Sequence, residues 1–195
     1  SFMCRPPFPS IMSSGWHLHQ SLVEISTGET ILPSSELGQH YLAGLIEHGR
    51  AMTAFASPSV TSYERYQPNA LAPQTVSWGT DSRAAMLRVL PNRIENRVGE
   101  PMANPYLYIA SQIYAGLDGL ERKLIVPPSN DPSAKPLPAS LAEALSALDA
   151  DAAYSAGFGT DFVRYYTHIK RFELARYADA ADKLDWVRRD YFNRF

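Results

Sequence analysis

The sequence predicts an α+β domain in which short strands and longer helices are followed by a helical C-terminal tail. Alternating apolar and polar residues near positions 15–25 and 74–98 are typical of short strands, whereas longer segments carry apolar residues at helical spacing. A proline-rich connector from Pro127 to Pro138 precedes the last helical segments. The 195 residues, 45% of them hydrophobic, suffice for one substantial core.

The first predicted elements are a strand within residues 15–25 and a helix from Glu36 to Phe55. Ser34 or Ser35 is the expected N-cap of this helix, because a serine side chain accepts a hydrogen bond from the first helical turn. Residues 57–73 contain several prolines among polar residues, which indicates a long irregular loop.

Three short strands are predicted next, and a tight turn at Pro91-Asn92 joins the last two into an antiparallel hairpin. A helix then runs from Asn104-Pro105 to about Lys123, with Asn104 as N-cap and proline in the first turn. The predicted strands are Gln74–Trp78, Ala85–Leu90 and Arg93–Val98, and the predicted tail helices are Ser140–Leu148, Thr160–Tyr177 and Asp182–Phe192.

Charge and composition exclude several classes of protein. A formal net charge of −2 gives no long-range attraction for nucleic acid, so we expect no nucleic-acid partner. The lone cysteine, Cys4, cannot form an internal disulfide, and no apolar run reaches the ~18 residues of a membrane span, so we expect a cytoplasmic protein. The opening residues read as the interior of a longer chain, and we expect further residues upstream.

The segment Arg93-Ile94-Glu95-Asn96-Arg97 carries the most specific chemical signal. The two-residue period of a strand places both arginines and the glutamate on one face, which is too charged for a core. This face is either a surface ion-pair ladder or one wall of a site for an anionic group beside a metal-bound carboxylate. Two alternating histidines, His17 and His19, and two further arginines, Arg83 and Arg88, favour the second interpretation.

Five motifs, in this order and spacing, resemble the C-terminal part of the catalytic domain of the glutamine synthetase family. They are Ser14–Ser21, Ser62–Arg65, Asn104–Leu107, Gly116–Gly119 and Arg188–Phe192. The resemblance implies an antiparallel sheet lined with charged side chains and backed by helices. It assigns residues 1–126 to a core of sheet, loop and helix and residues 127–195 to a linker and helical tail. The family's N-terminal small β-domain and the first part of its catalytic domain are absent from these residues.

By this resemblance, His17 and Glu95 match the family's ligands for the divalent ion that bridges the phosphates of ATP. One imidazole and one carboxylate suit Mg²⁺ or Mn²⁺, with water and phosphate oxygens completing the coordination. The residues that match positions near the nucleotide are His19, Ser21, Arg88 and Arg93.

The resemblance also assigns three arginines to the transferring phosphoryl group and to glutamate. Arg65 would contact the α-carboxylate of glutamate, and Arg83 and Arg97 would contact its γ-phosphate and γ-carboxylate. Phosphoryl transfer depends on positioning and charge neutralisation, which permanently charged guanidinium groups supply. Structural ion pairing is the alternative for each of these arginines.

Two departures from the family pattern concern the glutamate and acceptor pocket. Leu71 lies in the loop where glutamine synthetases carry a glutamate that helps to bind ammonium, and an aliphatic side chain there suits a larger amine. Met12 and Ser13 stand where the family usually has an Asn-Gly pair touching glutamate, so the glutamate contact is in question there.

These features predict an ATP-dependent ligase that joins the γ-carboxylate of glutamate to a small organic amine through γ-glutamyl phosphate. A true glutamine synthetase using ammonia and a non-catalytic ring-forming scaffold are the alternatives. The resemblance implies ATP and Mg²⁺ (or Mn²⁺) as cofactors and a homo-oligomeric ring. The family's second metal site is built from glutamates that would precede Ser1, so we expect residues 1–195 alone to lack ligase activity.

Other polar and aromatic residues are predicted to have structural roles. Trp16 and Trp78 are expected to be core or wall aromatics. His40, His48 and His168 lie on predicted helices without metal-ligand spacing and are expected at the surface or at helix caps. The mixed charges of the tail indicate a solvated, ion-paired helical surface.

Overall fold

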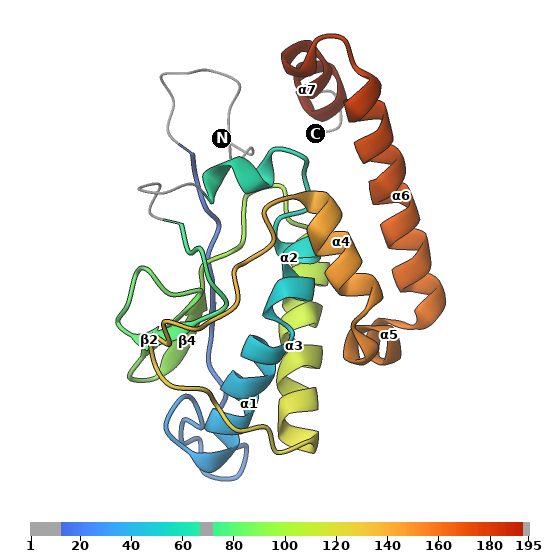
Figure 1. The fold of residues 1–195 in the computed structure, drawn as a ribbon. Helices are drawn as coiled ribbons and strands as arrows, with labels where there is room; N and C mark the ends of the chain where they lie inside the picture. The colour runs from blue at the N-terminus through green and yellow to red at the C-terminus, as the bar shows by residue number, and fades with distance from the viewer. Residues whose placement is uncertain (1–12, 67–71, 193–195) are drawn as a thin grey trace.

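The computed structural model describes residues 13–66 and 72–192. A four-stranded sheet with the order β1-β4-β3-β2 lies against the helices α1, α2 and α3, and the helices of the C-terminal tail pack outside them (Figure 1). The main core joins both layers: Leu87 and Ile94 of the sheet and Met52 and Phe55 of the helices are all essentially inaccessible to solvent. The predicted α+β class is confirmed.

The strands are β1 (Leu18–Gln20), β2 (Trp78–Thr80), β3 (Leu87–Leu90) and β4 (Arg93–Asn96). The predicted hairpin is present, since β3 and β4 pair antiparallel and Leu90 faces Arg93 across the turn. β1 also pairs antiparallel with β4, but β2 runs parallel to β3, so one pairing differs from a wholly antiparallel sheet.

All four strands are shorter than predicted, and β2 is also displaced along the chain. The predicted strand 15–25 pairs with β4 over three residues, after which the chain folds back on itself through a bridge between Val23 and Thr30. Most of the predicted strand Gln74–Trp78 lies outside the sheet and contacts the connector instead. The backbone N–H of Val76 donates to the carbonyl of Lys135 at 2.8 Å. β2 therefore begins where that segment was predicted to end.

The predicted helix 36–55 is divided into α1 (Glu36–Glu47) and α2 (Gly49–Ala56) at His48. Ser35 is the N-cap of α1 and accepts a hydrogen bond from the N–H of Gly38 at 2.9 Å. His48 was predicted at the surface or at a cap, and it does occupy the junction of the two helices, but it is buried. Its two ring nitrogens lie 2.7 Å from Asp151 and 2.8 Å from Asp118, so burial is compensated on both sides.

The helix α3 (Pro105–Glu121) begins as predicted. The side chain of Asn104 accepts hydrogen bonds from the N–H groups of Tyr106 and Leu107 at 3.0 and 3.3 Å. α1 and α3 cross closely at a pair of glycines: a Cβ on Gly44 would lie 2.9 Å from the Cα of Gly119. The absence of side chains at this crossing lets the two backbones approach each other.

The loop after α2 contains a 3₁₀ helix (Ser62–Arg65), and the tail forms α4 (Leu141–Asp149), α5 (Ala152–Phe158), α6 (Thr160–Asp179) and α7 (Lys183–Phe192). The prediction missed α5, which spans seven residues and ends at Gly159 with φ 90°. Such a short helix shows too few turns for a recognisable apolar period.

The tail is ion-paired as predicted, for instance between Arg176 and Asp190 at 2.7 Å. Glu173 is different because it is buried, accepting a hydrogen bond from the Tyr191 hydroxyl at 2.6 Å and lying 3.3 Å from Lys170. This carboxylate therefore fastens α7 to α6. None of the helices in residues 13–66 and 72–192 has the length and apolarity that a bilayer-spanning helix needs.

Candidate active site

The charged residues of the sheet gather on the face that points away from the helices. The register pairs His19 with Glu95 and Glu95 with Arg88, so these three side chains lie in a row across β1, β4 and β3. Their neighbours Leu87 and Ile94, which project from the opposite face, are fully buried in the core. The alternation predicted for β4 is therefore present in the structure.

Glu95 is the centre of this cluster, and its side chain is buried although it carries a carboxylate. Its Oε1 lies 2.8 Å from Nδ1 of His17, and its Oε2 accepts a hydrogen bond from the Arg88 guanidinium at 3.0 Å. Nε of Arg97 is 3.7 Å and Nε2 of His19 is 3.9 Å from Oε1. Four cationic or potentially cationic groups thus surround one carboxylate.

This surrounding sets the protonation states of the central pair. Burial raises the pKa of Glu95, but the hydrogen bonds from Arg88 and His17 outweigh it, so the pKa is lower than usual. Burial and the charge of Arg97 lower the pKa of His17 despite its bond to Glu95. At neutral pH the pair is therefore a carboxylate and a neutral imidazole, which are the forms that bind a divalent ion.

Arg88 is held from two sides. Besides Glu95, its guanidinium binds the carboxylate of Asp81, with Nε donating at 2.8 Å. Hydrogen bonds from Arg88 lower the pKa of Asp81, which stays ionised. Asp81 was not predicted as a site residue, since a lone aspartate after a strand carries no motif.

Arg93 lies at the other end of β4 and donates through Nε to Nδ1 of His19 at 3.2 Å. Arg88, Arg93 and His19, which were predicted near the nucleotide, thus share one face with Glu95. Ser21 is exposed just after β1, and Arg83 is exposed in the loop between β2 and β3. The charge of Arg83 contributes to lowering the pKa values of Asp81 and Arg97, which places it in electrostatic range of the cluster.

Arg65 is buried and binds backbone rather than a carboxylate in this structure. It donates to the carbonyls of Val98 and Gly99 at 2.8 and 3.0 Å and to that of Arg97 at 3.1 Å. It therefore fixes the segment that leaves β4. Ser13 is half-buried, whereas Met12 and Leu71 lie outside the described residues.

The pair His17 and Glu95 fits part of a magnesium or manganese site. Gly15 leaves room beside the imidazole, because a Cβ there would lie 2.6 Å from Nε2 of His17 and 2.7 Å from Nη2 of Arg65. No cluster of three or more His, Cys, Asp or Glu side chains in the described part of the chain could hold a metal ion. A divalent ion here would take two protein ligands and complete its coordination with water, phosphate oxygens or ligands from elsewhere.

The family of this chain follows from comparison with known protein families. The sequence profile of "Glutamine synthetase, catalytic domain" matches residues 1–189. The chain belongs to the glutamine synthetase family.

Curated relatives of this glutamine synthetase-family chain include γ-glutamylanilide and γ-glutamylethanolamide synthetases and glutamine synthetases. It is 39% identical to a γ-glutamylanilide synthase of Acinetobacter sp, covering 99% of this chain and 44% of that protein. It is 38% identical to the glutamine synthetase of Vibrio alginolyticus, over 84% of this chain and 40% of the relative. A γ-glutamylethanolamide synthetase of Streptomyces coelicolor is 32% identical, over 100% of this chain and 44% of the relative.

The fold of this family member agrees with solved structures. A structure described as a GmaS/ADP complex superposes with a TM-score of 0.84 at 30% identity, covering 99% of this chain and 49% of that one. The apo form of GmaS gives the same TM-score at 31% identity. The chain thus spans about half the length of the relatives it matches.

Proposed function

We propose that the whole protein is an ATP-dependent ligase that joins the γ-carboxylate of glutamate to an organic amine. The observation that carries this proposal is the buried Glu95 carboxylate held by His17 and Arg88 on the open face of the sheet. The family match and a solved relative described as an ADP complex support a nucleotide as the partner of this face.

In the proposed reaction, the residues of this face bind and position phosphate. His17 and Glu95 would hold Mg²⁺ or Mn²⁺, which supplies charge neutralisation for the phosphates of ATP. Arg88 and Arg93, with His19 and Ser21 nearby, would orient the nucleotide. Guanidinium groups suit this task because they stay charged and offer paired donors to phosphate oxygens.

Arg83 and Arg97 are proposed to stabilise the phosphoryl group as it passes from ATP to glutamate. Burial lowers the pKa of Arg97, but a guanidinium starts from so high a value that it remains a cation at neutral pH. A fixed cation in a water-poor site stabilises developing negative charge more than a mobile one would. Arg65 is proposed to contact the α-carboxylate of glutamate and, through its three carbonyl partners, to keep the segment after β4 in place.

An organic amine is the proposed acceptor for two reasons. Leu71 stands in the loop where glutamine synthetases carry the glutamate that helps to bind ammonium, and an aliphatic residue there would suit the hydrocarbon body of an amine. The relatives at 39% and 32% identity are named for anilide and ethanolamide products.

We also propose a homo-oligomeric ring, in which exposed aromatic residues of α6 such as Tyr165 and Phe172 would be covered.

Phosphate release by the protein at its natural length tests the activity. With ATP, Mg²⁺ and glutamate, we expect a higher kcat/KM with aniline, ethanolamine, isopropylamine or putrescine than with ammonium. Glu95→Gln should lower turnover by on the order of 100-fold, since it removes the central charge. Glu121→Gln, at the exposed end of α3, is the matched control and should leave turnover unchanged.

The other outcomes identify the alternatives. Fastest turnover with ammonium would indicate a true glutamine synthetase. No phosphate release with any acceptor, together with no nucleotide binding, would indicate a non-catalytic scaffold.

A further inference from the structure

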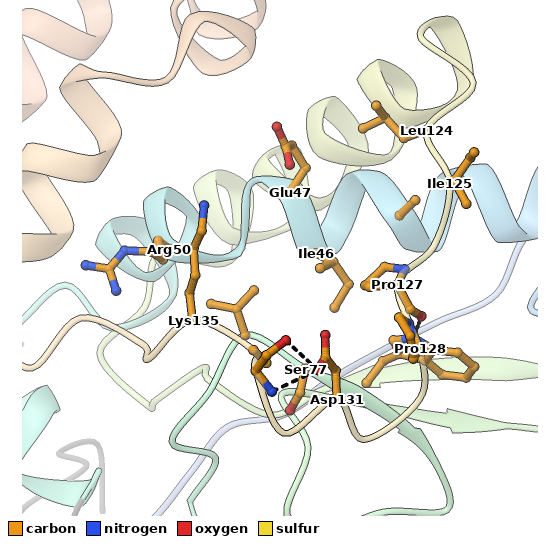
Figure 2. A pocket seen from close by; sticks show the side chains of 15 residues that line it. Ile46, Glu47, Arg50, Ser77, Leu124, Ile125, Pro127, Pro128, Asp131 and Lys135 are labelled. Carbon is orange, nitrogen blue, oxygen red and sulfur yellow. Dashed lines mark hydrogen bonds between the residues drawn. The ribbon is translucent and has the colours of Figure 1, made fainter.

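A cavity of about 350 Å³ lies on the helix side of the sheet, and Figure 2 shows the side chains that line it. Its walls come from α1 and the start of α2, from the segment leading into β2, and from the connector 124–135. Trp78 belongs to this side because it pairs in register with the buried Leu87, whereas Arg88 projects from the other face. The cavity is therefore distinct from the proposed phosphate site.

The connector wall is fixed to the sheet edge by hydrogen bonds. Asn130 donates its backbone N–H to the carbonyl of Trp78 at 2.7 Å, and the Trp78 indole donates to the carbonyl of Pro127 at 2.7 Å. The N–H of Leu137 binds the carbonyl of Gln74 at 2.9 Å. The connector wall is thus fixed by two backbone hydrogen bonds and one from the Trp78 indole, and the volume of the cavity lies in the range of small-molecule sites.

Apolar side chains form one part of the inner surface of the cavity, and polar and charged side chains form the rest. Ile46 points into it from α1 (Figure 2), and the other apolar walls are Val76, Trp78, Leu124 and Pro127. Such a surface favours the hydrocarbon or aromatic part of a ligand over water.

Charged side chains of both signs lie at the rim of the cavity. The side chain of Lys135 extends toward α1 and α2, and within the described ranges no ion pair or hydrogen bond engages its ammonium group (Figure 2). Asp131 accepts hydrogen bonds through Oδ1 from the N–H and hydroxyl of Ser133 at 2.8 and 2.7 Å, which lower its pKa and keep it ionised. Arg50 is already bound to the carbonyl of Pro136, and Glu47 lies 3.8 Å from Arg122.

We propose that this cavity binds an α-amino acid with an apolar or aromatic side chain. Its carboxylate would pair with Lys135, its ammonium group with Asp131, and its side chain would pack on Ile46 and Trp78. A simple anion would meet the two acids of the rim, and a simple amine would leave Lys135 without a partner. A zwitterion with a hydrocarbon body satisfies both signs and the apolar wall.

Equilibrium dialysis of labelled L-phenylalanine against the protein at its natural length tests the site. We expect saturable binding of one molecule per chain that persists in excess glutamate. Lys135→Met should weaken binding about tenfold, which is the size of one lost charge-assisted hydrogen bond. Lys123→Met, an exposed lysine outside the cavity, should bind as the unaltered protein does.

Phenethylamine and phenylacetate, which each lack one charge, should bind at least tenfold more weakly than L-phenylalanine. Absence of saturable binding, displacement by glutamate, equal binding of either analogue, or unchanged affinity in Lys135→Met would each overturn the proposal. Because the readout is binding and not turnover, it is independent of whether the ligase activity is found.

Discussion

The His48 junction provides a test of how this fold is held together. Replacing His48 by leucine removes the group that lies between Asp118 and Asp151 and leaves two carboxylates facing an apolar side chain. The side chains of the three residues are 6%, 18% and 10% exposed, so solvent screens them little. Removing one partner of such a buried ionic group costs about 3–5 kcal/mol. For a chain of this size that lowers Tm by about 6–20 °C.

The stabilisation that His48 provides should depend on pH. Burial lowers the pKa of His48, but its hydrogen bonds to Asp151 and Asp118 outweigh that, and the pKa is raised. A raised pKa means that the stabilisation is fully present below the unfolded value of about 6.5 and is lost as pH rises through the folded value. Arg122 also binds Asp118, at 2.8 Å, and the ring of Tyr154 lies 5.5 Å from the imidazole.

Urea unfolding of the unaltered chain and of His48→Leu at pH 6 and pH 9 measures both effects. We expect a large difference in unfolding free energy at pH 6 that narrows at pH 9. His168→Leu, on the exposed face of α6, is the matched control and should change stability little at either pH. A difference that is absent at pH 6, or that grows with pH, would refute the reasoning.

Three further predictions concern the packing of α1 on α3, the N-cap of α3 and the activity of residues 1–195 alone. Gly44→Ala should destabilise the chain by about 1–3 kcal/mol in urea unfolding, because the new Cβ would meet the backbone of Ala115 and Gly119 at the crossing of α1 and α3; an unchanged midpoint would contradict this close approach. Asn104→Ala should cost about 1 kcal/mol in the same measurement through loss of the α3 N-cap, whereas Asn104→Ser should retain most of it. A preparation shown by mass spectrometry to contain residues 1–195 alone should release no phosphate above background, and turnover by it would disprove the prediction.

Elements with strong local signals could be predicted from the sequence. The Asn-Pro start of α3, the Ser35 cap of α1 and the turn between β3 and β4 each depend on a few adjacent residues. The common face of His17, Glu95 and Arg88 followed from the strand period together with the family resemblance.

Features that depend on long-range contacts could not be predicted. The break at His48 is held by Asp118 and Asp151, which are 70 and 103 residues away, so periodicity continued through it. β2 starts later than predicted because the backbone N–H of Val76 binds the carbonyl of Lys135 in the connector instead of pairing with a strand of the sheet. Asp81 lies only seven residues from Arg88 and was missed for a different reason, since a lone aspartate after a strand carries no motif.

Binding of Mn²⁺ in the presence of ADP, followed by the EPR signal of free Mn²⁺, tests the central claim most directly. The protein at its natural length and its Glu95→Gln and Glu121→Gln variants are compared. Loss of a supporting group around a bound metal costs about 10–100-fold in affinity, so loss of the Glu95 charge should cost at least about tenfold. We predict that weakening in Glu95→Gln and none in Glu121→Gln. Equal Mn²⁺ affinity in all three proteins would contradict the assignment of this face to a metal-bound nucleotide.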